Sequence, residues 1–177
     1  MIGLENVTLQ SARLEYRLLN DDDREPLSRL LQDPAVTEPG GFRPAQTPAA
    51  FDAFYAELTQ YHTAIAILHQ QELIGYLHVN KYVVEQEPFS KKRCVSVGFA
   101  IGKAFQNQGF GTEALKSLTE YLLTRFDACF ADHFIENLPS QRVIEKSGYS
   151  YFEEYKMFFD ALGQEKTCRS YVRLSSQ

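Results

Sequence analysis

The sequence predicts a mixed α/β fold in which helices flank a central sheet. Segments with alternating apolar residues, typical of strands, are interspersed with segments whose apolar residues recur at helical spacing. Their order lacks the regular strand–helix alternation of a doubly wound parallel sheet. The chain has 177 residues, of which 44% are hydrophobic and 23% charged, so we expect one globular domain spanning residues 1–177.

The first third of the chain is predicted to hold one strand and two helices. Alternating apolar residues indicate a strand over 13–19, after which Asn20 can cap a short helix that reaches Leu31. Residues 33–48 contain four prolines and two glycines, which predicts a long loop, and such loops are often functional. Aromatic residues at helical spacing predict a second helix over 48–61.

The remaining elements alternate between strands and two further helices. Strands are predicted at 64–69, 73–84, 94–101, 128–134, 149–159 and 168–174. Helices are predicted at 109–123 and from Pro139 to Lys146, where Gly148 can supply a left-handed cap. The aromatic residues of the last two strands could pair subunits, although burial in the monomer core is the simpler expectation.

Charge and cysteine usage exclude several classes of function. The net charge of −5 argues against nucleic-acid binding, which requires a basic face. No segment approaches the ~20 apolar residues of a membrane span, and the N-terminus does not resemble a secretory signal. Cys94, Cys129 and Cys168 lie in separate predicted strands, without the CxxC or HxxxH spacing of a metal site. They are therefore expected to be buried thiols of a cytoplasmic protein.

A glycine-containing segment over 106–114 is the most informative local feature. Gly109 and Gly111 directly precede an amphipathic helix, and the N-terminus of a helix presents unpaired N–H groups that favour an anion. Glycine lets a phosphate approach the backbone closely. The segment therefore predicts a ligand that carries phosphate.

Two phosphate ligands fit poorly. Residues 109–114 match the GxGxxA pattern of a dinucleotide site, and Asp132 lies where a ribose-binding acid would be. However, Gly102–Gln108 separate the preceding strand from the first glycine, whereas a dinucleotide fingerprint begins where its strand ends. NAD binding thus stays as the weaker alternative. A P-loop is excluded because no Lys-Ser/Thr pair follows the glycines.

The third ligand, acyl coenzyme A, is suggested by a family resemblance. Gln106-x-x-Gly109-x-Gly111 resembles the Q/R-x-x-G-x-G/A loop of the GNAT superfamily of N-acetyltransferases. Val97–Ile101 resembles the central strand that precedes this loop. Three further segments, in the expected order, resemble the branch that contains ribosomal-protein N-terminal acetyltransferases: Arg13–Leu18, Thr112–Leu115 and the N-x-x-S-x-R-V-x-E-K-x-G-Y segment over 137–149. The resemblance covers about residues 11–174.

The resemblance implies a three-layer fold with acetyl-CoA as cofactor and coenzyme A as product. Its mixed, mostly antiparallel and twisted sheet would have about six or seven strands, about four flanking helices and two splayed central strands. The exposed strand edge formed by Phe99, Ala100 and Ile101 would pair with the pantetheine arm. The implied loop contacts are Gln106, Asn107, Gln108, Gly109, Phe110, Gly111 and Thr112, and Asn137 would contact the cofactor or the backbone beside it.

The resemblance leaves the catalytic residues less well defined. Many members place a tyrosine seven residues after the asparagine to protonate the departing thiolate, and this position is Ile144 here. Ser140 is the candidate replacement, with a helix-capping role as the alternative. His133 is the candidate general base, although a surface role or a water chain to a carboxylate would also fit.

The resemblance implies transfer of an acetyl group to a primary amine. The branch favours the N-terminal α-amino group of a protein or peptide, and a polyamine or an aminoglycoside is the alternative acceptor. Because Ile144 removes one usual acid, a catalytically silent acyl-CoA-binding module is a further alternative. The chain is expected to act as a monomer or a homodimer.

Overall fold

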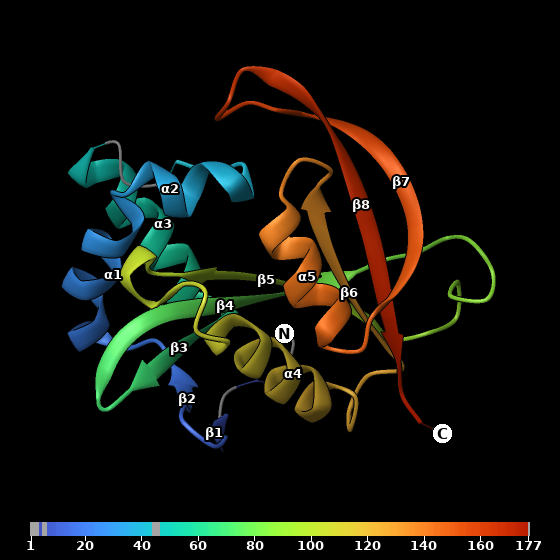
Figure 1. Ribbon diagram of the computed structural model, residues 1–177, viewed down its shortest axis with the longest axis horizontal. Helices are drawn as coiled ribbons and strands as arrows, with labels where there is room; N and C mark the ends of the chain where they lie inside the picture. Colours follow the sequence, from blue (N-terminus) through green and yellow to red (C-terminus); the bar gives the residue numbers. More distant parts are fainter. Residues whose placement is uncertain (1–3, 5–6, 44–46, 177) are drawn as a thin grey trace.

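A computed structural model describes residue 4 and residues 7–43 and 47–176, which form one eight-stranded sheet with helices on both faces (Figure 1). The sheet order is β1-β2-β3-β4-β5-β6-β8-β7, and every neighbouring pair is antiparallel except β5 and β6. The strands are β1 (Thr8–Gln10), β2 (Glu15–Leu18), β3 (Ala64–His69), β4 (Glu72–Tyr82), β5 (Cys94–Ile101), β6 (Ala128–Phe134), β7 (Ser150–Phe159) and β8 (Gln164–Leu174). The α-helices are α1 (Arg24–Leu31), α2 (Pro34–Thr37), α3 (Pro48–Gln60), α4 (Phe110–Leu122) and α5 (Leu138–Lys146).

The predicted fold class is confirmed, with one strand and one helix more than expected. The additional strand is β1, which pairs with β2 through Leu9 and Tyr16. The additional helix, α2, lies in the segment that the prolines predicted to be a loop. Pro34 occupies its first turn, where no N–H is needed, and the Asp33 side chain accepts a hydrogen bond from the Ala35 N–H at 2.9 Å. A 3₁₀ turn, η2 (Glu38–Gly40), follows, and residues 44–46 of the predicted loop lie outside the described residues.

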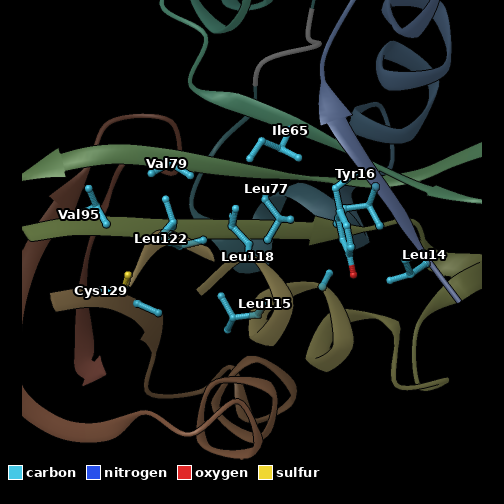
Figure 2. Packing of buried hydrophobic residues seen from close by; sticks show 14 of the residues in the cluster. Leu14, Tyr16, Ile65, Leu77, Val79, Val95, Leu115, Leu118, Leu122 and Cys129 are labelled. Carbon is cyan, nitrogen blue, oxygen red and sulfur yellow. The ribbon is translucent and has the colours of Figure 1, made fainter. Parts of the chain in front are cut away.

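The two faces of the sheet carry separate helices and separate hydrophobic cores. Helix α4 covers one face, where Leu115, Leu118 and Leu122 pack against strand residues such as Leu77 (Figure 2). Helices α1 and α3 cover the other face, where Tyr76 and Ala100 belong to the second core. Because successive strand residues point to opposite faces, odd- and even-numbered residues of β5 and β6 face different cores.

The central strands β5 and β6 are splayed, as predicted. Among the described residues they pair only at three positions, Cys94↔Ala128, Val95↔Cys129 and Ser96↔Phe130. Strand β5 continues to Ile101 in full register with β4, whereas β6 continues to Phe134 in register with β8. A gap therefore opens between the two strands beyond Ser96.

The expected burial is confirmed for the cysteines and wrong for part of the last two strands. Cys94, Cys129 and Cys168 are buried free thiols within strands. Tyr151 and Phe158 are 57% and 58% exposed because β7 lies at the edge of the sheet, where no further layer covers it. No helix in the described ranges is long and apolar enough to cross a membrane.

The packing of α4 predicts a large stability loss for Leu118→Ala. Leu118 is fully buried, so the truncation removes apolar contacts and leaves a cavity, which typically costs about 2–5 kcal/mol. Urea unfolding should show this decrease in the free energy of unfolding. Leu174→Ala is the matched control because Leu174 is 51% exposed, and a comparable loss there would contradict this account of the core.

Candidate active site

A cleft of about 810 Å³ lies where β5 and β6 diverge. It is lined from one side by the segment over 106–112 and α5, and from the other by α2, η2, α3 and β4. The predicted site residues that line it are Phe99, Ala100, Ile101, Gln106, Asn107, Gly109, Gly111, Thr112, His133, Asn137 and Ser140. Two predicted residues contribute differently. The side chain of Gln108 donates to the Ala104 carbonyl at 2.9 Å, and Phe110 is buried in the core below α4.

Gly109 and Gly111, the two glycines of the segment over 106–112, have different structural environments. Gly109 is the N-cap of α4 and has a φ of +83°, a left-handed conformation that L-residues adopt at a cost. A Cβ on Gly111 would lie 3.5 Å from Val143 and 3.7 Å from Ile101, both of which line the cleft. These are ordinary van der Waals distances, so a side chain on Gly111 would be directed toward residues of the cleft wall without backbone strain.

The start of α4 has the features of an anion site. No side-chain hydrogen bond caps this helix among the described residues, and its first backbone bond in sequence runs from the Glu113 N–H to the Gly109 carbonyl at 3.0 Å. The N–H groups of Phe110, Gly111 and Thr112 consequently have no acceptor within the helix. Together with the helix dipole, they favour a negatively charged ligand.

The splayed edge of β5 exposes backbone groups to the cleft. The Gly102 N–H donates to the Ile74 carbonyl of β4 at 2.8 Å, so by alternation the backbone groups of Phe99 and Ile101 face away from β4, toward the gap. Gln106 donates from Nε2 to the Ile101 carbonyl at 2.9 Å. Gln106 thus joins the end of β5 to the glycine loop.

Helix α5 begins at the cleft with Asn137 as its N-cap. The Asn137 Oδ1 accepts the Ser140 N–H at 3.2 Å, and its Nδ2 donates to the Pro39 carbonyl of η2 at 3.0 Å. Asn137, rather than Ser140, therefore caps the helix and connects it to the opposite wall. Ser140 is half-buried in the cleft lining. Ile144 is fully buried, as an aliphatic side chain at this position would be.

Asp132, which the sequence suggested only as the ribose-binding acid of the weaker dinucleotide alternative, lines the cleft. It belongs to β6 beyond the last residue paired with β5, on the sheet face of Phe130. Tyr155 donates from its hydroxyl to the Asp132 Oδ2 at 3.3 Å. Loss of hydration between the protein walls raises the pKa of the Asp132 carboxyl, although the side chain remains exposed to the cleft.

The two histidines of the cleft lie on different faces of the sheet. His133 packs against Tyr171 on the α4 side, with ring centroids 5.4 Å apart, and is only 4% exposed. Its Nδ1 lies 2.7 Å from the Phe134 carbonyl. His78 shares the face of Tyr76, and burial lowers the pKa of its imidazole.

The match to a family model covers residues 13–150, which correspond to the acetyltransferase (GNAT) domain, so the chain belongs to this family. It is an acetyltransferase that uses acetyl-CoA as the acyl donor. The structure fits this donor, since an uncapped helix N-terminus suits its diphosphate and an open strand edge suits its pantetheine amides. A search of curated proteins found no match.

Several solved structures share the fold over nearly the whole chain. An acetyltransferase of the GNAT family from Bacillus anthracis aligns with a TM-score of 0.83 and 18% identity, covering 97% of this chain and 100% of that one. Spermidine N-acetyltransferase from Vibrio cholerae aligns at 0.76 and 16%, covering 94% and 98%. Ribosomal-protein-S5-alanine acetyltransferase from Vibrio fischeri aligns at 0.75 and 14%, covering 97% and 98%. At these identities the similarity establishes the fold alone.

We predict that Gly111→Glu abolishes the thermal stabilisation that acetyl-CoA confers. A carboxylate in the first turn of α4 is compatible with the helix but would project beside the anion site and repel a diphosphate. A ligand that binds only the folded state raises the melting temperature, so unfolding with acetyl-CoA, and with NAD for comparison, measures the loss.

Lys116→Gln is the matched control for this substitution. It lowers the net charge by the same amount at an exposed position of α4, away from the cleft. The acetyl-CoA shift should persist in this variant. An unchanged shift in Gly111→Glu would contradict the placement of the diphosphate, and a shift with NAD in the unaltered protein would contradict selectivity for acetyl-CoA.

Proposed function

We propose that the protein acetylates the N-terminal α-amino group of a protein or peptide. The observation that carries this proposal is the composition of the acceptor side of the cleft. Its described lining is mainly apolar, including Val36, Phe42, Phe54 and Tyr76, and Asp132 is its sole carboxylate. An α-amino group supplies one positive charge next to a peptide, whereas a polyamine carries several charges that would need several carboxylates.

The cofactor side of the cleft is proposed to position the donor. The N–H groups at the start of α4 bind the diphosphate, and the edge of β5 at Phe99 and Ile101 binds the pantetheine arm. Arg142 and Lys146 of α5 also line the cleft and would add positive charge for the phosphates. When bound, acetyl-CoA supplies the thioester that the amine attacks. Fixing both of its ends makes positioning a large part of the catalysis.

Asp132 is proposed as the general base, in place of His133. An ammonium group must lose a proton before its nitrogen can attack, and a carboxyl with a raised pKa is suited to accept it. Asp132 faces the acceptor side of the sheet, whereas His133 faces α4 and α5 and is almost fully buried. The Tyr155 hydroxyl holds the Asp132 carboxylate by a hydrogen bond.

Ser140 is proposed as the proton donor to the thiolate that leaves coenzyme A. Its hydroxyl lies in the lining of the cleft on the α5 side, and Asn137 already provides the helix cap. This arrangement leaves the Ser140 hydroxyl available for the cofactor. Ser140 would thus take the role of the tyrosine that many family members carry at the position of Ile144.

We further propose that residues 1–177 form one domain in a reducing compartment, the cytoplasm. Strands β7 and β8 lie almost wholly beyond the matched residues 13–150 yet belong to the same sheet as the rest. Buried free thiols support the compartment.

An acceptor screen tests the proposed function. Purified protein, acetyl-CoA and a peptide library that varies the N-terminal residue should release free coenzyme A, detected with a thiol reagent, and peptides with a blocked α-amino group should not react. Turnover restricted to spermidine or spermine would replace the proposed acceptor with a polyamine. Binding of acetyl-CoA without turnover of any amine would support the silent module instead.

Asp132→Asn should lower activity while stabilising the folded protein at neutral pH. Loss of a general base typically reduces the rate 10²–10⁴-fold. A carboxyl whose pKa is raised by folding destabilises the fold when ionised, above its folded pKa, and this effect disappears below the unfolded value. The gain in melting temperature should therefore be present at pH 7 and decline as the pH falls toward the unfolded pKa.

The exposed Asp160→Asn change in the β7–β8 turn is the control for Asp132→Asn. It makes the same chemical change away from the cleft and should alter neither activity nor the pH dependence of melting. Full activity in Asp132→Asn would eliminate Asp132 as the base.

A further inference from the structure

Two motifs that are 100 residues apart meet beside the glycine loop. Glu113 of α4 accepts hydrogen bonds from the Ser11 hydroxyl at 2.6 Å, the Arg13 N–H at 2.8 Å and the Arg13 Nε at 2.7 Å. Its side chain is 15% exposed. The N-terminal segment before β2 is thereby fastened to the first turns of α4.

Arg13 also holds the loop itself. Its Nη1 donates to the Gln108 carbonyl at 2.9 Å, and its guanidinium lies 4.4 Å above the centre of the Phe110 ring. In a planar trans peptide the carbonyl and the following N–H point in opposite directions. A Gln108 carbonyl held toward Arg13 therefore turns the Gly109 N–H away from Arg13, which adds a donor to those at the start of α4.

Arg13 compensates a charge that would otherwise oppose the ligand. Glu113 lies in the first turn of α4, close to the N–H groups proposed to bind the diphosphate, where an unpaired carboxylate would repel it. Burial disfavours the charged form of Glu113, but the hydrogen bonds from Ser11 and Arg13 together outweigh it and lower the pKa of this carboxyl. Glu113 is thus ionised at neutral pH, with Arg13 as its counter-charge.

We propose that Arg13 is a positioning residue for the diphosphate of acetyl-CoA, an inference that rests on the placement of that diphosphate proposed above. Arg13 orients the Gly109 N–H through the Gln108 carbonyl and neutralises Glu113. Both effects concern only the diphosphate. The acceptor side and the strand edge at Phe99 do not depend on them.

The test is Arg13→Met, which keeps an unbranched aliphatic side chain and removes the charged guanidinium, including its contact with the Phe110 ring. The KM for acetyl-CoA should rise about tenfold, the effect of losing one charge-assisted hydrogen bond, while kcat and the KM for the amine stay unchanged. With S-acetylpantetheine, which has no diphosphate, Arg13→Met and the unaltered protein should perform equally. A general structural defect would instead lower the activity with acetyl-CoA and the activity with S-acetylpantetheine to the same extent.

Arg93→Met is the matched control variant. Asp127 accepts the Arg93 N–H at 2.7 Å and the Arg93 Nη2 at 3.3 Å, so this pair resembles Arg13–Glu113 but lies outside the cleft. It should not change the KM for acetyl-CoA. An increase as large as that of Arg13→Met, or no increase in Arg13→Met, would overturn the proposal.

The double variant Arg13→Met/Glu113→Gln separates charge compensation from simple damage. Removing the uncompensated carboxylate should restore part of the acetyl-CoA affinity lost in Arg13→Met, whereas a purely structural pair would give no recovery.

If Arg13→Met does not fold, Arg13→Lys provides the same comparison, since a single ammonium cannot reproduce the forked contacts with Glu113 and Gln108. Equal use of acetyl-CoA and S-acetylpantetheine by the unaltered protein would refute the proposed diphosphate site, an outcome distinct from failure of the Arg13 proposal.

Discussion

The divergence of β5 from β6 is the constraint on which the rest of the site depends. Parallel pairing stops after Ser96 and Phe130, although both strands continue with their other neighbours. Unpaired backbone groups inside a protein are unfavourable unless a partner satisfies them. The edge of β5 therefore remains accessible only because the cleft reaches it, and a cofactor with amide groups can complete the pairing.

The alternation of strand side chains divides this opening into two functional sides. Odd-numbered residues of β5 and β6 point toward α4, whose N-terminus is the proposed diphosphate site, and even-numbered residues point toward the face of α1 and α3. The neighbours Asp132 and His133 consequently serve different sides, although they are adjacent in sequence. Asn137 joins the two walls because it caps α5 and also binds Pro39.

The features that the sequence could predict are those encoded locally. The glycine loop, the α5 cap at Gly148 and most strands follow from short-range patterns. The loop predicted at 33–48 was wrong where the single helical turn α2 and the 3₁₀ turn η2 form. The sequence suggests Asp132 only as the ribose-binding acid of a dinucleotide site, because its position beside the acceptor side of the cleft depends on the divergence of two strands, which no local pattern records. The same holds for Arg13, whose partners lie 95 and 100 residues away.

The long sequence separation of the Arg13–Glu113 pair also bears on how the protein folds. Bringing together two residues that are 100 positions apart costs chain entropy, and this cost precedes the gain from their contact. Such pairs therefore tend to form late in folding. Helix α4 can form from local contacts alone. The peptide between Gln108 and Gly109, however, is held in its orientation only when the N-terminal segment packs against this helix. On the proposal for Arg13, the ability to bind the diphosphate would form late in folding, and local opening of the N-terminal edge would remove it while leaving the central strands intact.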